Sequence, residues 1–221
     1  MVQRGSMAMT AKALTKGEQT RARILDFAGE SVLQKGFVST SIDELIADAG
    51  ITKSGFFYHF RDKNDLARGL VQRYLDNDNA IFADLFARAD ALHDDPLQSF
   101  LIFLKLLAGV MEDLPKGHPD CIISSFCYQD QLFSRDIREM TAQGVRAWRE
   151  RIRPRLDKIA ERYPPKIPVD LDTLAYMLSA AADGGIVISK VLAQPRHLPD
   201  QILIYRRFVE AVFLGTPTPQ A

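Results

Sequence analysis

The feature that most constrains this chain is a glycine-containing turn between two short helical patterns, within residues 41–66. Ser41, followed three residues later by Glu44, forms a capping box, in which each side chain satisfies a backbone N–H of the first helical turn. Gly50 tolerates the left-handed conformation that follows a helix end, and Thr52 can cap the next helix after about three to four residues. Asp62 offers a third N-cap. The spacing predicts a helix-turn-helix followed by a longer helix.

The second short helix divides into two sides. The apolar side, which we expect to be buried, contains Ile51, Phe56 and Phe60. The opposite side holds a cation, hydroxyls and an aromatic ring, in the pairs Lys53/Phe57 and Ser54/Tyr58. A polar and aromatic face on a short second helix is typical of a segment that contacts DNA.

This stretch resembles the N-terminal domain of the TetR family of bacterial transcriptional regulators, whose pattern is A-G-(V/I)-(S/T)-K-x-x-(L/F)-Y-x-H-F-x-x-K-x-x-L. Matching or corresponding positions are Ala49, Gly50, Ile51, Thr52, Lys53, Ser54, Gly55, Phe56, Phe57, Tyr58, His59, Phe60, Lys63 and Leu66. The preceding residues 20–41 resemble the first helix of that family and its Gly-Phe turn, so the likeness covers residues 18–70. One position departs from the pattern, because Phe57 stands where the family commonly has a tyrosine that contacts a DNA phosphate.

The resemblance and the residue chemistry together predict roles in DNA binding. Thr40 and Ser41 are expected to present hydroxyls and backbone N–H groups to a phosphate, and Lys63 matches the family's phosphate-contacting lysine. The residues expected to enter the major groove are Thr52, Lys53, Ser54, Gly55, Phe57 and Tyr58. His59 is expected at the surface or against the backbone. For Phe57 the alternative is a second core aromatic.

The charge distribution predicts only a moderate electrostatic attraction to DNA. Lys and Arg number 28, equal to Asp and Glu, and the bases are in slight excess only in the N-terminal part. We therefore expect few phosphate contacts per subunit. The longest apolar run, residues 100–111, is interrupted by Lys105 and is too short to span a bilayer, which predicts a cytoplasmic protein without a membrane partner.

The remaining chain of this 221-residue protein has helical periodicity throughout, which predicts an all-α fold. Helices are expected at about 62–88, from 96 through 100–111, and at 121–133, 134–162, 170–193 and 199–214. The expected organisation is a flexible arm (1–17), a three-helix DNA-binding domain (18–66), a larger helical ligand-binding and dimerisation domain (67–214) and a tail (215–221).

The last two predicted helices suggest a homodimer. Leu171, Leu174, Leu178, Ala181, Ala182, Gly185 and Ile188 share one face of the first, and Ile202, Tyr205, Val209, Val212 and Phe213 share one face of the second. Packing these helices on their copies would form a four-helix interface through 170–193 and 199–214. The alternative is that the same faces pack within one subunit.

Apolar and aromatic side chains in the larger domain predict a pocket for a small apolar or aromatic molecule. The candidates are Phe100, Phe103, Leu104, Leu107, Met111, Phe126, Trp148, Tyr176 and Met177. Polar groups that could orient a ligand are Gln129, Asp130, Gln143 and Asp183. An ordinary hydrophobic core is the alternative reading of the same stripes.

These patterns predict a dimeric repressor that binds a palindromic operator in double-stranded DNA and is released by a small effector. The four histidines are scattered, and neither a metal-ligand spacing nor a nucleophile motif is present, so we expect neither an enzyme nor a cofactor. The alternatives are a helical carrier or enzyme without DNA binding, and a regulator switched by Cys121 and Cys127. Those two cysteines are otherwise expected to be small buried residues.

Overall fold

The computed structural model describes residues 15–112 and 121–215, and these residues are helical without any strand. The helices in the described ranges are α1 (Lys16–Ser39), α2 (Ile42–Asp48), α3 (Lys53–His59), α4 (Lys63–Leu92), α5 (Pro96–Glu112), α6 (Ile122–Cys127), the 3₁₀ turn η1 (Asp130–Leu132), α7 (Arg135–Arg162), α8 (Leu171–Val191) and α9 (His197–Leu214). The all-α prediction is confirmed. Residues 1–14, 113–120 and 216–221 lie outside the described ranges.

Local signals position the three helices at the N-terminal end, α1 to α3, which we call the head. Helix α1 begins with a capping box between Thr15 and Glu18, so residues 15–17 belong to this helix start and not to a flexible arm. The Gly-Phe turn is made by Gly36, whose φ of +83° interrupts the helix before Ser39. The chain then turns into α2.

The predicted caps of α2 and α4 are confirmed. The Ser41 hydroxyl accepts a hydrogen bond from the Glu44 backbone N–H (3.4 Å), and the Asp62 carboxylate accepts one from Asp65 N–H (2.8 Å). Because these bonds join residues three apart, the sequence specifies them directly.

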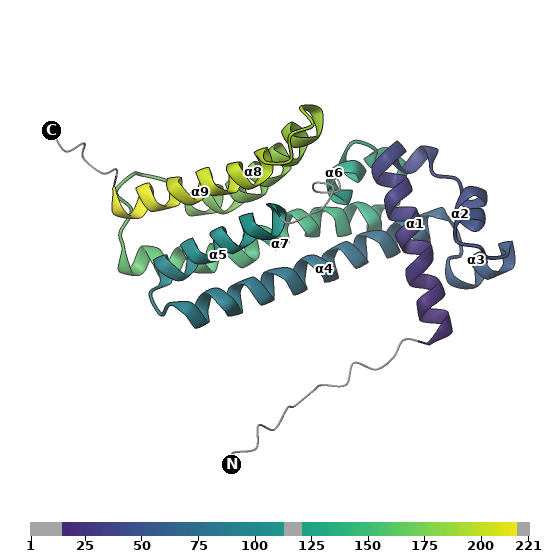
Figure 1. The fold of residues 1–221 in the computed structure, drawn as a ribbon, viewed down its shortest axis with the longest axis horizontal. Helices are drawn as coiled ribbons and strands as arrows, with labels where there is room; N and C mark the ends of the chain where they lie inside the picture. Colours follow the sequence, from purple (N-terminus) through teal and green to yellow (C-terminus); the bar gives the residue numbers. More distant parts are fainter. Residues whose placement is uncertain (1–14, 113–120, 216–221) are drawn as a thin grey trace, which may run out of the picture.

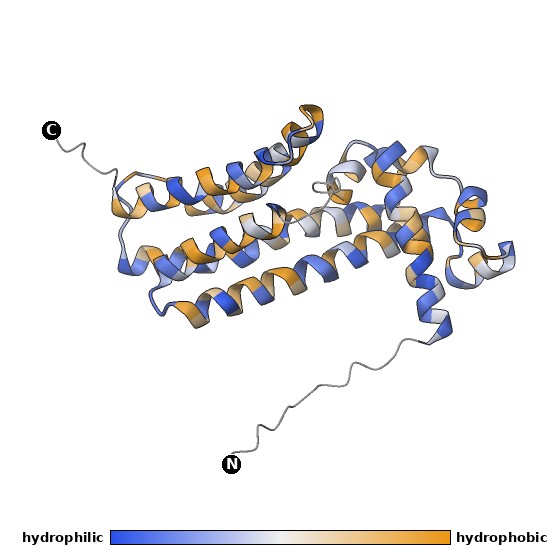
Figure 2. Ribbon diagram, viewed as in Figure 1, coloured by the Kyte–Doolittle hydropathy of each residue, from blue (hydrophilic) through white to orange (hydrophobic). Residues whose placement is uncertain are grey.

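The larger part of the molecule is a layered bundle built alongside α4. Figure 1 shows α4 running from the head to the far end, with α5, α7, α8 and α9 along the same direction. Helix α5 packs against α4, α7 and α9, and its Phe100, Leu104 and Leu107 are fully buried, so α5 lies at the centre of the bundle. Figure 2 shows hydrophobic and hydrophilic residues recurring along each long helix, the pattern of helices that bury one face.

The segment expected to be one helix from 121 to 133 is divided. Helix α6 ends at Cys127, Gln129 has a non-helical backbone (φ −129°, ψ 24°), and the short turn η1 follows. This break turns Phe133 back onto Phe126, with ring centroids 4.4 Å apart, and both rings contact Phe37 at the end of α1. Helix periodicity alone could not predict it, because the break is stabilised by aromatic packing against the head.

The two cysteines have different environments. Cys121 is buried at the start of α6, whereas Cys127 at its end is exposed. The expectation of two buried cysteines is therefore wrong for Cys127.

Helix α8 is long and apolar enough, by length and composition, to cross a membrane. A core helix of a soluble protein meets the same criterion, and one side of α8 packs against α7 and α9.

Candidate DNA-binding surface and ligand cavity

The turn between α2 and α3 sets the direction in which α3 starts. Gly50 has φ +61°, and no atom beyond its two chain neighbours lies within 4 Å of the position where a Cβ would stand. Glycine is therefore favoured here by the backbone conformation and not by lack of space. The Ile51 N–H donates to Ile46 O (3.1 Å), which closes the turn. The Thr52 hydroxyl then accepts from the Gly55 N–H at 3.0 Å and begins α3.

Helix α3 has the two faces that the sequence predicts. Phe56 and Phe60 are fully buried in the head, and their rings lie 5.8 Å apart. The exposed residues are Thr52, Lys53, Ser54, Phe57 and Tyr58, with Gly55 and His59 partly buried.

The two adjacent aromatics of α3 differ in accessibility. Tyr58 is 83% exposed, whereas Phe57 is 43% exposed and meets the Phe56 ring edge to face at 5.4 Å. Phe57 therefore lies at the edge of the core, with part of its ring accessible, whereas most of the Tyr58 side chain is exposed to solvent.

The predicted phosphate contact at residues 40–41 needs a correction. Thr40 is buried, and its hydroxyl donates to Gly36 O (3.0 Å) and lies 3.0 Å from the Ser31 hydroxyl. Its backbone N–H donates to Phe37 O (3.3 Å). Thr40 therefore holds the end of α1, and neither its hydroxyl nor its N–H faces a phosphate. Ser41 is only partly buried.

Lys63 has a structural contact that the sequence did not reveal. Its ammonium donates to Val38 O (3.0 Å) and lies 4.7 Å from the centroid of the Phe37 ring. Partial burial lowers the pKa of Lys63. The side chain thus ties the start of α4 to the end of α1, in addition to any contact with DNA.

His59 lies at the other side of the head, partly buried beside α1. Burial and the nearby Arg21 guanidinium lower its pKa, and the ring meets Tyr58 edge to face at 5.0 Å. A neutral imidazole at physiological pH can support α3 but adds no positive charge to the surface.

The exposed cation of α3 has a nearby acid. Lys53 Nζ lies 3.6 Å from Asp43 Oδ1, and the two side chains are 69% and 80% exposed. Solvent screens such a pair strongly, so Lys53 can leave Asp43 for a DNA acceptor at little cost.

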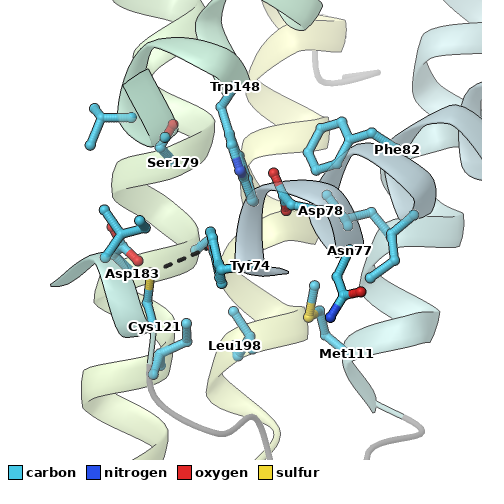
Figure 3. A pocket seen from close by; sticks show the side chains of 17 residues that line it. Tyr74, Asn77, Asp78, Phe82, Met111, Cys121, Trp148, Ser179, Asp183 and Leu198 are labelled. Carbon is cyan, nitrogen blue, oxygen red and sulfur yellow. Dashed lines mark hydrogen bonds between the residues drawn. The ribbon is translucent and has the colours of Figure 1, made fainter. Parts of the chain in front are cut away.

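The larger part of the molecule contains a cavity of about 150 Å³ between α4, α5, α6, α7, α8 and α9 (Figure 3). Three of the nine predicted pocket residues, Leu107, Met111 and Trp148, line it. The other lining residues are Tyr74, Asn77, Asp78, Ile81, Phe82, Cys121, Ile123, Gly144, Val145, Ser179, Ala182, Asp183, Ile186 and Leu198.

The remaining six predicted pocket residues lie elsewhere. Phe100, Phe103 and Leu104 are fully buried core residues, and Phe103 stacks on Phe86 with centroids 4.0 Å apart. Phe126 belongs to the aromatic cluster at the head. Tyr176 and Met177 are 39% and 38% exposed on the outer side of α8. The alternative of an ordinary hydrophobic core therefore fits Phe100, Phe103, Leu104 and Phe126, whereas Tyr176 and Met177 lie neither in the cavity nor in the core.

Asp183 is the one member of the four proposed polar groups that lines the cavity. It lies beside Tyr74 and Cys121, whose thiol donates to the Tyr74 hydroxyl at 3.5 Å. Burial, followed by the charge of Asp183, raises the pKa of the Cys121 thiol, so this buried thiol is a poor nucleophile.

Asp78 is the second carboxylate of the cavity. Burial raises its pKa, while Arg151, at 2.9 Å, and the Trp148 indole N–H lower it. Tyr74 and Asp78 are four residues apart on α4, so they lie on the same side of the helix. Two polar residues at this spacing on an otherwise apolar side are the sequence signal that could have predicted their place in the cavity.

Comparison with known proteins gives one family. Residues 24–70 match the family described as bacterial regulatory proteins, tetR family. The HTH-type transcriptional regulator AcrR of Shigella flexneri is 40% identical over 58 residues, which are 26% of this chain and 27% of that protein. TtgR of Pseudomonas putida is 25% identical over 137 residues, or 61% of each chain. The chain thus matches less than two thirds of the length of these relatives.

The similarity to known proteins in fold covers more of the chain than the similarity in sequence. A TetR-family transcriptional regulator from Agrobacterium tumefaciens, of known structure, superposes with a TM-score of 0.72 at 19% identity, covering 89% of this chain and 99% of that one. The matched residues and the helix-turn-helix geometry of the head agree with one another: residues 24–70 form a domain of the tetR family of bacterial regulatory proteins, and the larger helical part shares the fold of a TetR-family regulator.

Proposed function

We propose that this protein is a homodimeric repressor that binds a palindromic operator in double-stranded DNA and is released by a small ligand in the cavity. The observation that supports it most is the exposed face of α3, where Lys53, Ser54, Phe57 and Tyr58 project from a rigidly capped and packed head. Such a helix is suited to the major groove.

A second copy fits the outer side of α8 and α9. Most residues that the sequence suggested for the interface, such as Leu178 and Val209, are buried within the subunit, whereas Ile188 is exposed. The other large apolar side chains exposed on these helices were not among those suggested: Tyr176, Met177, Val187, Val191 and Leu192 on α8, and Leu203, Ile204 and Leu214 on α9. Apolar side chains gathered on two adjacent helices are typical of a protein interface. Two heads are also needed to reach half-sites about 34 Å apart.

Helix α6 connects the cavity to the head. Cys121 and Ile123 at its start line the cavity, whereas Phe126 near its end contacts Phe37 of α1. Helix α4 also connects the two regions, because its Tyr74 lines the cavity and its Lys63 donates to Val38 O in the head. A ligand that favours a different placement of α6 or α4 would therefore change the separation of the two heads.

DNA binding is tested by footprinting on the region upstream of the protein's own gene, with Lys53→Ala as the variant. We expect protection of a palindromic site and a loss of affinity of about tenfold or more in Lys53→Ala, because one good base or phosphate contact contributes about 1–3 kcal/mol. If Lys53 contacts a phosphate, the salt dependence also weakens by about one counterion per subunit.

The matched control is Lys105→Ala, which removes an exposed lysine from α5, away from the head. It should leave DNA affinity unchanged. Absence of any protected palindrome at moderate salt would count against the proposal. A carrier or enzyme without DNA binding would show this absence while retaining its ligand affinity in Lys53→Ala.

The dimer is tested by sedimentation equilibrium of Ile204→Glu, which puts a charge on an exposed apolar side chain of α9. We expect a dimer for the unchanged protein and a monomer that remains folded for the variant, since burying an unpaired charge in the interface is costly. Equal dimerisation of the two proteins would place the interface elsewhere.

A further inference from the structure

Lys53, the first residue of α3, has an acid from the neighbouring helix beside it. Its Nζ lies 3.6 Å from Oδ1 of Asp43, which belongs to the first turn of α2. Helices α2 and α3 contact each other, and Figure 1 shows them next to each other at one end of the molecule. In a helix-turn-helix, residues at the start of the second helix contact base edges. A carboxylate beside Lys53 therefore stands where bases would be read.

The capping of α2 is carried out by other residues. Ser41 and Glu44 form the capping box, and Glu44 also pairs with Lys35 at 2.6 Å. Asp43 takes no part in that box, and its side chain is 80% exposed. The Asp43 carboxylate is thus available to DNA together with the Lys53 ammonium, on two helices whose starts are both fixed by caps.

An acid on a DNA-binding surface is unfavourable near every phosphate, because it repels the negative charge of the backbone. This cost is offset where the major groove presents a hydrogen-bond donor to the carboxylate. The donors in that groove are the amino groups of cytosine, N4, and adenine, N6, and an aspartate typically accepts from cytosine N4. Asp43 therefore favours particular bases over DNA in general.

One G·C base pair offers partners to both side chains. Guanine presents two acceptors, O6 and N7, which suit a lysine, and cytosine presents the N4 donor, which suits an aspartate. A Watson–Crick hydrogen bond joins N4 to O6, so these two atoms lie about 2.9 Å apart. That spacing is close to the 3.6 Å between Lys53 Nζ and Asp43 Oδ1. In an A·T pair the N6 donor lies between two single acceptors, N7 and O4, so the lysine loses one of the adjacent acceptors that guanine offers.

We propose that Asp43 is a specificity-determining residue, which reads the cytosine of one G·C base pair in each half-site while Lys53 reads the guanine of the same pair. The assignment rests on the proposed function, because α3 must enter the major groove for Asp43 to reach a base. Helix α2 then takes part in reading the sequence, in addition to supporting α3.

Operators that differ at single positions test this assignment. After footprinting has located the operator, each position is changed symmetrically in both half-sites to all four base pairs. Binding of the full-length protein to each duplex is measured by fluorescence anisotropy at one fixed salt concentration, and a duplex of unrelated sequence gives the non-specific affinity. We expect the unchanged protein to prefer G·C at one position where Lys53→Ala has lost this preference.

Asp43→Ala should relax the preference for G·C at that same position. The ratio of affinities between G·C and the other base pairs should fall about tenfold per half-site, a factor typical of one good contact between a side chain and a base. Affinity for the G·C operator itself should change less, because the lost contact with cytosine and the relieved repulsion from phosphates oppose each other. Non-specific affinity should rise.

The matched control is Asp48→Ala, which removes an exposed acid from the other end of α2. It changes the net charge by the same amount as Asp43→Ala, so an effect of total charge appears in both variants. The base preference of Asp48→Ala should equal that of the unchanged protein at every position. Circular dichroism first establishes that each variant is folded.

Three results would overturn the assignment while operator binding by the unchanged protein remains. In the first, Asp43→Ala changes the affinity for all operator variants by one factor, as an effect of charge alone requires. In the second, Asp43→Ala and Lys53→Ala relax the preference at different positions. In the third, the unchanged protein prefers a base pair other than G·C at the position that Lys53 reads. Absence of any protected operator would refute the proposed function together with the assignment, so the two failures are distinguishable.

Discussion

Two adjacent glycines of α8 allow the close packing of α8 on α9 to be measured. A Cβ added at Gly185 would lie 2.8 Å from the Leu198 Cα and 3.1 Å from its Cδ1, whereas a Cβ at Gly184 would meet nothing within 4 Å. Ordinary carbon contacts are about 3.5–4.0 Å, so Gly185→Ala requires the start of α9 to move by roughly 0.7 Å or more. The obstacle is backbone, which cannot rotate away.

The magnitude follows from two opposing terms. Overpacking a core costs about 1–3 kcal/mol, while replacing a helical glycine by alanine gains about 1 kcal/mol. Gly185→Ala should therefore lower the free energy of unfolding by up to about 2 kcal/mol, and Gly184→Ala should not lower it through packing within the subunit. Since the propensity gain is common to both variants, their difference measures the packing strain alone, about 1–3 kcal/mol.

Urea denaturation followed by circular dichroism, at one fixed protein concentration, measures these free energies. Gly185→Ala should unfold at a lower urea concentration than both the unchanged protein and Gly184→Ala. If Gly185→Ala unfolds at the same urea concentration as Gly184→Ala, α8 and α9 are not packed this closely. The proposed dimer face is built on these two helices, so Gly185→Ala should also weaken DNA binding.

Two further predictions concern groups around the cavity. Arg151→Met leaves Asp78 buried without its partner and should cost about 3 kcal/mol near neutral pH. Burial raises the pKa of Asp78, so the cost is present above that raised pKa and should shrink as the pH falls towards the ordinary Asp value of 3.8; an equal loss at pH 4 and pH 7 would contradict this. A thiol reagent should modify exposed Cys127 rapidly and buried Cys121 only after addition of urea, and equal rates in the folded protein would show that Cys121 is accessible.

The head could be predicted from the sequence in detail because its signals are local. Ser41, Thr52 and Asp62 each bond an N–H three residues ahead, and Gly50 is needed for a backbone conformation that other residues rarely adopt. The buried side of α3 follows from helical spacing.

The same rules failed at Thr40. Its position before a cap suggested a phosphate contact, but packing against α1 turned its hydroxyl inward.

The cavity was only partly predictable, because a helical stripe does not reveal which neighbour covers it. Leu104 and Leu107 share an apolar helix, yet Leu104 is core and Leu107 lines the cavity. Tyr74 and Asp78 come from α4, distant in sequence from the segments that complete the cavity. The helical periodicity of a sequence does not show which distant segments pack together.

The sequence by itself determined the number and approximate extent of most helices, the helix-turn-helix and its exposed face, since these depend on interactions within about one helical turn. The tertiary structure alone decided which side of α8 and α9 remains exposed, that Asp183 and Ser179 share a cavity, and that α6 breaks to place Phe133 against the head. These features depend on contacts between segments far apart in the chain, where the best packing of the whole core overrides the preference of each helix.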